Sequence, residues 1–271
     1  MTVIEVRGLI RDYQGRRAVD GIDLTVAAGE VFALLGPNGA GKTTTVEILE
    51  GHRRRDAGEV RVLDEDPQRA GRAWRCRIGV VLQSATDVAE LTVAESVRHF
   101  AGYYPRSRDA ATVLDQVGLT EQAGKRIRAL SGGQRRRVDV ALGIIGSPEV
   151  LFLDEPTTGF DPQARRQFWK LVRQLAHDGT TILLTTHYLE EAEALADRIA
   201  IMVSGRLVAG ARAHQRRHRA RPLHLRGDGE DPPAARLRQA QRLGPDRGGH
   251  HRDGPRPAHP ATGAGVRPVG P

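Results

Sequence analysis

Residues 36–43 read GPNGAGKT, which fits the phosphate-binding pattern G-x-x-x-x-G-K-[ST]. A short apolar run, 31–35, precedes this loop and a helical pattern follows it to Gly51, so the loop joins a strand to a helix. Glycines allow backbone N–H groups to close around phosphate oxygens, and the N-terminus of the helix adds partial positive charge. Lys42 offers a charge to the β- and γ-phosphates, and the Thr43 hydroxyl suits Mg²⁺. An ordinary glycine-rich turn would not need these flanks, so the sequence predicts binding of a nucleoside triphosphate.

Paired carboxylates end a second apolar run, VLFLDE at 150–155. Asp154 is placed to hold Mg²⁺ through water, and Glu155 is placed to polarise an attacking water as a general base. A solvated acidic turn is the alternative, which the phosphate loop and the buried strand disfavour. The two carboxylates therefore predict hydrolysis of the bound nucleotide.

Two further polar residues, Gln83 and His187, follow the apolar runs at 77–83 and 180–186. The Gln83 amide oxygen can reach Mg²⁺ or the attacking water, and His187 can donate a hydrogen bond to the γ-phosphate. Each has a plain alternative, a glutamine that caps a loop and a histidine that caps the helix predicted at 187–198. Because α/β sheets bind ligands at the carboxyl ends of their strands, we expect these side chains to converge.

A second candidate anion site lies at LSGGQRRR, residues 130–137. Ser131 makes a good helix N-cap with two glycines behind it, so backbone N–H groups there can receive an anion. A capped helix that binds nothing is the alternative. Tyr13 lies between strands predicted at 2–7 and 17–26, and its ring can stack on an adenine; an ordinary surface tyrosine is the alternative.

The apolar periodicity places these residues on alternating strands and helices. Residues 58–67 read as a hairpin or an edge strand, a helix runs from Pro162 to Leu175, and 198–209 read as a closing hairpin. Apolar residues recur at helical spacing between 90 and 145, which predicts a mainly helical insertion. The pattern predicts an α/β fold with parallel strands flanked by helices.

The charge of the 271-residue chain is uneven. The formal net charge is +8, but residues 211–271 hold 13 Arg and five acidic residues, so the first 210 residues are balanced. The excess therefore does not mark a nucleic-acid-binding face, and no nucleic acid is expected as a partner. One cysteine excludes a disulfide framework, no apolar run approaches about 18 residues, and the N-terminus lacks a signal-peptide core; a cytosolic chain is expected.

In this order, GPNGAGKTT, Gln83, LSGGQRRR, VLFLDEP, GFDP and His187 resemble the nucleotide-binding subunit of an ABC transporter. LSGGQ ahead of an apolar strand ending in Asp-Glu is highly specific to that family. The resemblance covers residues 1–209 and implies an ABC ATPase domain of the P-loop NTPase class. Its mixed sheet is flanked by helices, with a small antiparallel part and a helical subdomain inserted at about 84–145. Phe160 stands where the family usually has leucine, a small departure.

The resemblance carries the family's roles onto the matching positions of this sequence. It implies catalytic roles for Glu155, His187 and Gln83. It implies metal binding by Thr43, Gln83 and Asp154, with ATP and Mg²⁺ as cofactors. Nucleotide contacts are implied for Tyr13, Gly36, Pro37, Asn38, Gly39, Ala40, Gly41, Lys42, Thr43, Thr44, Ser131, Gly132, Gly133, Gln134 and Asp161.

The resemblance also implies partners. Two copies sandwich two ATP molecules head to tail, so that the ATP on one chain's phosphate loop meets residues 131–134 of the other chain. SGGQRRRVDVALG together with HYLEEAEALADRIAIM is similar to the branch that exports drugs and polyketides, which pairs this ATPase with a separate ABC-2-type membrane permease. The helical insertion and Gln83 would contact that permease. A homodimer on the inner face of the plasma membrane, associated with it through the permease, and a role in antibiotic resistance are the resulting expectations.

Three other classes of nucleotide-binding protein share part or all of this pattern. The ATPase subunit of an importer shares every one of these motifs. It differs only in the sequence variants that are typical of each branch of the family. A nucleic-acid-associated ABC ATPase would usually carry a long coiled coil or two cassettes, and this chain has neither. A GTPase would need an N-K-x-D motif, which is excluded because Asn38 is the only asparagine.

The tail at 210–271 has a different composition. From residue 211 it has no Ile, Met, Phe, Tyr, Trp, Lys, Asn, Ser or Cys, and six Leu or Val in all. So few apolar residues cannot offset the entropy of ordering, which predicts disorder. Either a natural basic tail or a reading-frame shift near codon 210 explains it. The 38 Arg against three Lys indicate a GC-rich gene and favour the frameshift.

Overall fold

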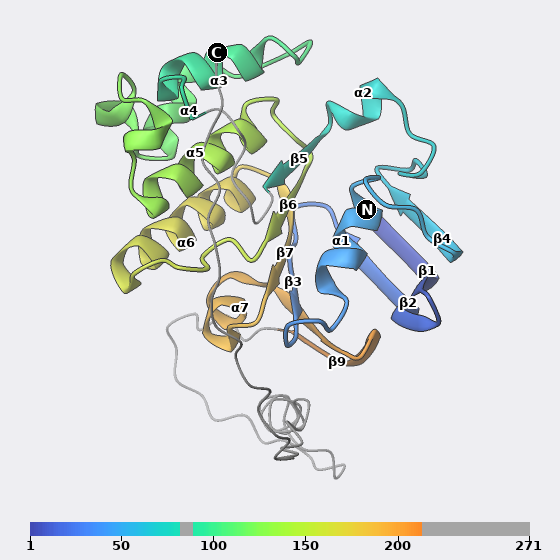
Figure 1. Ribbon diagram of the computed structural model, residues 1–271. Coiled ribbons are helices and arrows are strands. Elements are labelled where there is room, and N and C mark those ends of the chain that lie inside the picture. Colours follow the sequence, from blue (N-terminus) through green and yellow to red (C-terminus); the bar gives the residue numbers. More distant parts are fainter. Residues whose placement is uncertain (82–88, 213–271) are drawn as a thin grey trace, which may run out of the picture.

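The computed structural model describes residues 1–81 and 89–212, which form two sheets and a group of helices (Figure 1). The strands are β1 (Thr2–Tyr13), β2 (Arg16–Ala27), β3 (Val31–Leu35), β4 (Ala57–Val62), β5 (Ile78–Val81), β6 (Val150–Asp154), β7 (Thr181–Thr186), β8 (Arg198–Val203) and β9 (Arg206–Arg212). The helices are α1 (Lys42–Leu49), α2 (Arg72–Arg75), α3 (Val93–Ala101), α4 (Ala110–Gln116), α5 (Gly132–Ile144), α6 (Pro162–His177) and α7 (Leu189–Leu195), with 3₁₀ turns η1 (Thr120–Gln122) and η2 (Ile127–Ala129).

The larger sheet has the strand order β5-β6-β7-β3-β8-β9. Every pair from β5 to β8 is parallel, and β9 pairs antiparallel with β8, so the sheet is mixed as expected. All residues of β3, β6 and β7 are buried, which explains why these strands read as continuous apolar runs.

The two faces of this sheet meet two separate apolar cores. Alternate side chains of a strand point to opposite faces, so Ala33 and Leu35 join the core under α5 and α6, whereas Phe32 and Leu34 join the core around α1 and the smaller sheet. Figure 1 shows the same division, with α3 to α6 on one side of β6, β7 and β3, and α1 with β1, β2 and β4 on the other.

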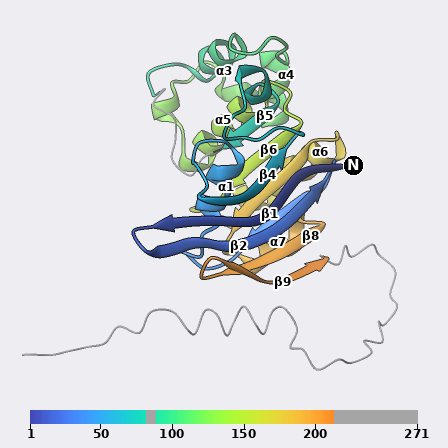
Figure 2. The same cartoon turned by 90° about the vertical axis from the view of Figure 1, so that its right-hand side faces the viewer.

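The smaller sheet is antiparallel, in the order β2-β1-β4. It lies beside the larger sheet with α1 packed between β2, β4 and β6 (Figure 2). The stretch predicted as a hairpin or edge strand is therefore the edge strand β4. Tyr13 is the last residue of β1 rather than a residue between two strands.

The helical insertion is present as α3, α4, η1, η2 and α5, and each of its α-helices has a side-chain cap. Thr92 and Glu95 form a capping box at α3, Asp109 caps α4, and Ser131 with Gln134 forms a capping box at α5. Such caps satisfy backbone N–H groups that have no partner within the helix. The N-cap predicted at Ser131 is confirmed.

The helix predicted at 187–198 was too long, since α7 spans Leu189–Leu195. Asp197 leaves the helix because its N–H donates to the Val31 carbonyl (2.8 Å) and its Oδ2 accepts from the Val31 N–H (2.9 Å). This contact brings the chain alongside β3, and Arg198 begins β8. Tertiary pairing therefore overrides a sequence of good helix formers.

Strand β9 continues to Arg212, three residues beyond the domain limit expected at 209. The tail predicted to be disordered was placed at 210–271, and this start was wrong, because residues 210–212 pair with β8 as the end of β9. The remainder, 213–271, lies outside the described part of the chain. Its disorder stays a prediction, as do the limits of the inserted subdomain.

Candidate nucleotide-binding site

The phosphate loop is packed tightly against its own protein. Gly41 precedes α1 with φ of 105°, and a Cβ atom there would lie 2.2 Å from the Ala18 carbonyl oxygen. A Cβ atom at Gly36 would lie 2.3 Å from the Met202 carbonyl oxygen. These two glycines are therefore required by close backbone approach, which fixes the loop between β2 and the end of β8.

Lys42 is 4% exposed and lies folded over this loop. Its Nζ donates to the carbonyl oxygens of Gly36 (3.0 Å) and Pro37 (3.1 Å), and it lies 3.2 Å from Glu155 Oε1. An incoming phosphate would meet an ammonium group that already has a carboxylate partner. The site thus holds its positive charge in place before any anion arrives.

Asp154, 5% exposed, faces the phosphate loop from the end of β6. Its Oδ2 accepts a hydrogen bond from Thr43 Oγ1 (3.1 Å), and its Oδ1 accepts one from Thr185 Oγ1. The described residues include no group of three or more His, Cys, Asp or Glu that could hold a metal ion. Mg²⁺ does not need such a group, because it is usually bound by one or two carboxylates together with substrate phosphates. The Thr43 and Asp154 oxygens fit that requirement.

Glu155 follows directly with φ of 44°, in the left-handed region that few non-glycine residues occupy. Its backbone N–H donates to Thr185 Oγ1 (3.0 Å) and to the Thr185 carbonyl (3.2 Å). Its side chain, 10% exposed, has one oxygen near Lys42 and the other 3.2 Å from His187 Nδ1. The His187 ring lies against Tyr188, with ring centroids 3.9 Å apart. A carboxylate between an ammonium group and an imidazole is well placed to orient a water beside the loop.

A cavity of about 690 Å³ opens over these groups, a size suited to a nucleotide. Tyr13 borders it, with the Arg11 and Arg53 guanidinium groups 4.8 Å and 5.5 Å from the ring centroid. The cavity, which we call the loop cavity, is lined by Tyr13, Arg16, Arg17, Ala18, Asn38, Gly39, Gly41, Lys42, Thr43, Thr44, Glu155, Ser204 and Gly205.

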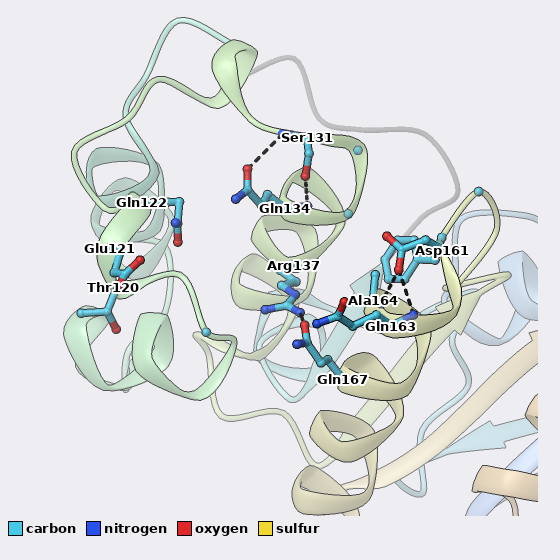
Figure 3. Close-up of a pocket in the computed structure, with 15 residues that line it drawn as sticks. Thr120, Glu121, Gln122, Ser131, Gln134, Arg137, Asp161, Gln163, Ala164 and Gln167 are labelled. Atoms are coloured by element: carbon cyan, nitrogen blue, oxygen red, sulfur yellow. Dashed lines mark hydrogen bonds between the residues drawn. The ribbon is translucent and has the colours of Figure 1, made fainter.

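A second cavity, of about 670 Å³, lies between η1, α5 and α6 (Figure 3). Ser131 and Gln134 border it at the start of α5, where Ser131 Oγ accepts from Gln134 N and Gln134 Oε1 accepts from Ser131 N. Asp161 borders it as the N-cap of α6, accepting from the backbone N–H groups of Gln163 and Ala164 at 2.8 Å each. This cavity, the Ser131 cavity, is lined by Gly118, Thr120, Glu121, Gln122, Ser131, Gly132, Gly133, Gln134, Arg137, Gly159, Phe160, Asp161, Gln163, Ala164 and Gln167.

A family profile described as "ABC transporter" matches residues 19–158, more than half of the chain. The chain belongs to the ABC transporter family. A solved ABC cassette, the dimeric post-hydrolysis structure of MJ0796 bound to ADP and Pi, superposes with a TM-score of 0.71 at 22% identity, covering 78% of this chain and 99% of that one. At that identity the likeness establishes the fold, which is the ABC ATPase fold expected from the sequence.

Two curated ABC relatives are much more similar in sequence. The daunorubicin/doxorubicin resistance ATP-binding protein DrrA of Streptomyces peucetius is 47% identical over 211 residues, 76% of this chain and 64% of DrrA. The Nod factor export ATP-binding protein I of Ralstonia nicotianae is 43% identical over 221 residues, 79% of this chain and 68% of that protein. The match to DrrA thus spans less than two thirds of that protein's length.

The ABC motifs named from the sequence fall into two groups. Tyr13, most of the phosphate loop and Glu155 line the loop cavity, with Asp154 and His187 beside Glu155. Residues 131–134 and Asp161 line the Ser131 cavity, and the two cavities have no lining residue in common. Gln83 lies outside the described residues.

Sequence reasoning missed several residues of the loop cavity. Arg16 and Arg17 begin β2, and Ser204 and Gly205 form the turn between β8 and β9. None of them belongs to a chemical motif, and no local signal marks them. Thr185, which holds both Asp154 and Glu155, could have been found. It lies at the carboxyl end of β7, the parallel neighbour of β6, where functional side chains gather.

Helix α5 carries the buried Arg136 and the largely buried Asp139 one turn apart, with Nη1 and Oδ2 3.8 Å apart. Burial raises the pKa of Asp139 to about 6, although the Arg136 charge opposes the shift. A carboxyl group whose pKa is raised on folding stabilises the fold below its unfolded pKa and loses that contribution as the pH rises through 6.

We therefore expect Asp139→Asn to increase the free energy of unfolding, relative to wild type, more at pH 8 than at pH 4. The free energy of unfolding of the variant, relative to wild type, should rise by about 2.5 kcal/mol between these pH values, since one pKa unit corresponds to about 1.4 kcal/mol and pH 4 lies close to the unfolded pKa of aspartate. Urea denaturation of both proteins at each pH measures the difference. Equal differences at pH 4 and pH 8 would show that Asp139 titrates normally.

Proposed function

We propose that this chain is the ATP-binding and ATP-hydrolysing subunit that powers an ABC exporter of drugs or other hydrophobic small molecules. The observation that carries the proposal is the meeting of Lys42, the Thr43–Asp154 pair and Glu155 around one nucleotide-sized cavity. The two curated relatives are named for daunorubicin and doxorubicin resistance and for Nod factor export, which supports export rather than import.

In this proposal Tyr13 stacks on the adenine, and the glycine-rich loop surrounds the phosphates with backbone N–H groups. Lys42 moves its charge from Glu155 to the β- and γ-phosphates. Thr43 and Asp154 hold Mg²⁺, which when bound neutralises charge on the phosphate oxygens. Glu155 accepts the proton of a water whose oxygen attacks the γ-phosphorus, the bond to the bridging oxygen breaks, and ADP and phosphate leave. His187 keeps the Glu155 carboxylate and the γ-phosphate aligned.

The catalytic unit we propose is a homodimer. Ser131 and Asp161 lie in a cavity separate from the loop cavity, so one chain does not bring Ser131 to its own Lys42. A second copy, turned head to tail, places its Ser131 cavity over the first chain's nucleotide. The dimeric arrangement of the solved cassette with ADP and Pi supports this assembly.

We further propose a separate membrane permease of the ABC-2 type as partner, with the ATPase on the inner face of the plasma membrane. Within residues 1–81 and 89–212, none of the helices combines the length and apolar character needed to cross a bilayer. The test is transport by inside-out vesicles that contain both proteins. ATP-dependent uptake of daunorubicin is expected, and uptake that proceeds equally without ATP would contradict the proposal.

Replacing Lys42 by alanine should weaken nucleotide binding itself. Charge-assisted hydrogen bonds are worth about 1.5–3 kcal/mol, which corresponds to roughly 10–100-fold in the Kd for ATP. Titration of the purified chain with a fluorescent ATP analogue measures the change. Lys170→Ala, on the exposed face of α6, is the matched control and should bind as wild type does. An unchanged Kd for Lys42→Ala would remove the loop cavity from the proposal.

A further inference from the structure

Arg136 reaches from α5 to the chain segment that carries Glu155. It is 8% exposed, its Nε donates to the Pro156 carbonyl (3.2 Å), and its Nη2 donates to the Asp154 carbonyl (2.8 Å). These two carbonyls belong to the residues immediately before and after Glu155. One guanidinium group therefore holds the backbone on both sides of the candidate general base.

The backbone conformation of Glu155 is unfavourable for a non-glycine residue and must be stabilised by its surroundings. A non-glycine residue in the left-handed region persists only where its surroundings fix it, and Glu155 has φ of 44°. Thr185 holds its N–H from the β7 side. Arg136 donates hydrogen bonds to the neighbouring carbonyls from the α5 side. The peptide groups around Glu155 are therefore fixed by two elements, β7 and α5.

Arginine suits this position better than lysine. Its planar guanidinium group directs two separate nitrogens, Nε and Nη2, at the two carbonyls, whereas lysine would have to make both bonds from one nitrogen atom. The neighbouring Arg135 offers a comparison, because it lies on the same helix but is exposed.

We propose that Arg136 is a positioning residue for ATP hydrolysis, which fixes the backbone of Glu155 and ties it to the helix that begins beside Ser131. This rests on the proposed ATPase function. Arg136 is not among the residues that line the loop cavity; it acts by keeping the Glu155 carboxylate aimed between Lys42 and His187.

The first test separates turnover from binding. Arg136→Gln should lower kcat about 10²-fold, the loss typical of an approximately 1 Å misplacement of a reacting group, while the Kd for ATP stays within about twofold of wild type. Arg136→Lys should recover part of kcat, and Arg135→Gln should behave as wild type. If Arg136→Gln does not fold, the same comparison is made with Arg136→Lys. Wild-type kcat in the folded variant, or equal losses of kcat and ATP binding, would overturn the proposal.

A double-mutant cycle asks whether Arg136 acts through Glu155. In the Glu155→Gln background, Arg136→Gln should change the residual rate by less than about twofold, because the group it positions is already absent. A further 10²-fold loss in that background would mean that Arg136 acts elsewhere, and would also overturn the proposal.

Amide hydrogen exchange provides a readout that needs no ATP turnover. In Arg136→Lys, exchange at the Glu155 amide should become at least about tenfold faster, while the amides of β3 keep their protection. Unchanged exchange at Glu155 would reject the positioning role even in an active enzyme. If the wild-type protein hydrolyses no ATP, the proposed function is rejected instead. Amide exchange at Glu155 would then still show whether Arg136 fixes the backbone there.

Discussion

Replacing Glu155 by glutamine should leave ATP binding intact and lower the rate of hydrolysis by about 10²–10⁴-fold, the usual contribution of a general base. The amide keeps the shape of the side chain but cannot accept a proton from water. Binding should be at least as tight as in wild type, because the Glu155 carboxylate no longer competes with phosphate for Lys42, 3.2 Å away. Steady-state phosphate release and equilibrium ATP titration measure the two effects.

The matched control is Glu190→Gln, a neighbouring acidic residue at the exposed start of α7. It removes the same charge from an exposed position and should retain wild-type turnover. Near-normal hydrolysis by Glu155→Gln would contradict the assignment of Glu155 as the general base. Loss of ATP binding together with hydrolysis would instead indicate a damaged loop cavity.

Complementation between two inactive chains should be the other large effect. Lys42→Ala disables the loop cavity, and Ser131→Arg fills the Ser131 cavity with a long charged side chain. Alone, each variant should be nearly inactive, since both sites of its dimer contain the defect. Mixed, they should recover about a quarter of wild-type activity, because half of the dimers are mixed and each mixed dimer has one intact site of two.

Two controls sharpen this experiment. Mixing Lys42→Ala with Lys42→Ala,Ser131→Arg double-mutant chains leaves no intact site and should recover nothing. Mixing wild type with the double mutant should lower activity at fixed total protein, because every mixed dimer has one chain without either half-site. If the two single mutants together hydrolyse no more ATP than either alone, the composite site is refuted.

The features that could be predicted from the sequence are those whose conformation depends on residues close together in the chain. The phosphate loop, the Asp-Glu pair and the Ser131 cap each lie in a short segment whose flanks fix its conformation, so type and spacing were sufficient. Buried strands such as β6 were evident for the same reason, since a strand covered on both faces must be continuously apolar.

Long-range contacts explain the rest. The end of α7 depends on the pairing of Asp197 with Val31, more than 160 residues earlier. Arg136 lies in the run QRRR, in which nothing along the chain distinguishes one arginine from the next, and the packing of α5 against the end of β6 buries it. The division of the motifs between two cavities likewise follows from the packing of α5 and α6, which no spacing along the chain encodes.

The position of β3 has a consequence for how the protein is made on the ribosome. Its two sheet neighbours, β7 at Thr181–Thr186 and β8 at Arg198–Val203, are synthesised long after Leu35, and the loop is later joined by Gly205, whose N–H donates to the Ala40 carbonyl (2.9 Å). At about 5–20 residues per second, this interval lasts roughly 10–30 s. Throughout it both edges of an apolar strand are unpaired, and such edges invite pairing with other chains. Slow codons between residues 45 and 205 should therefore lower the yield of folded protein without changing a single contact in it.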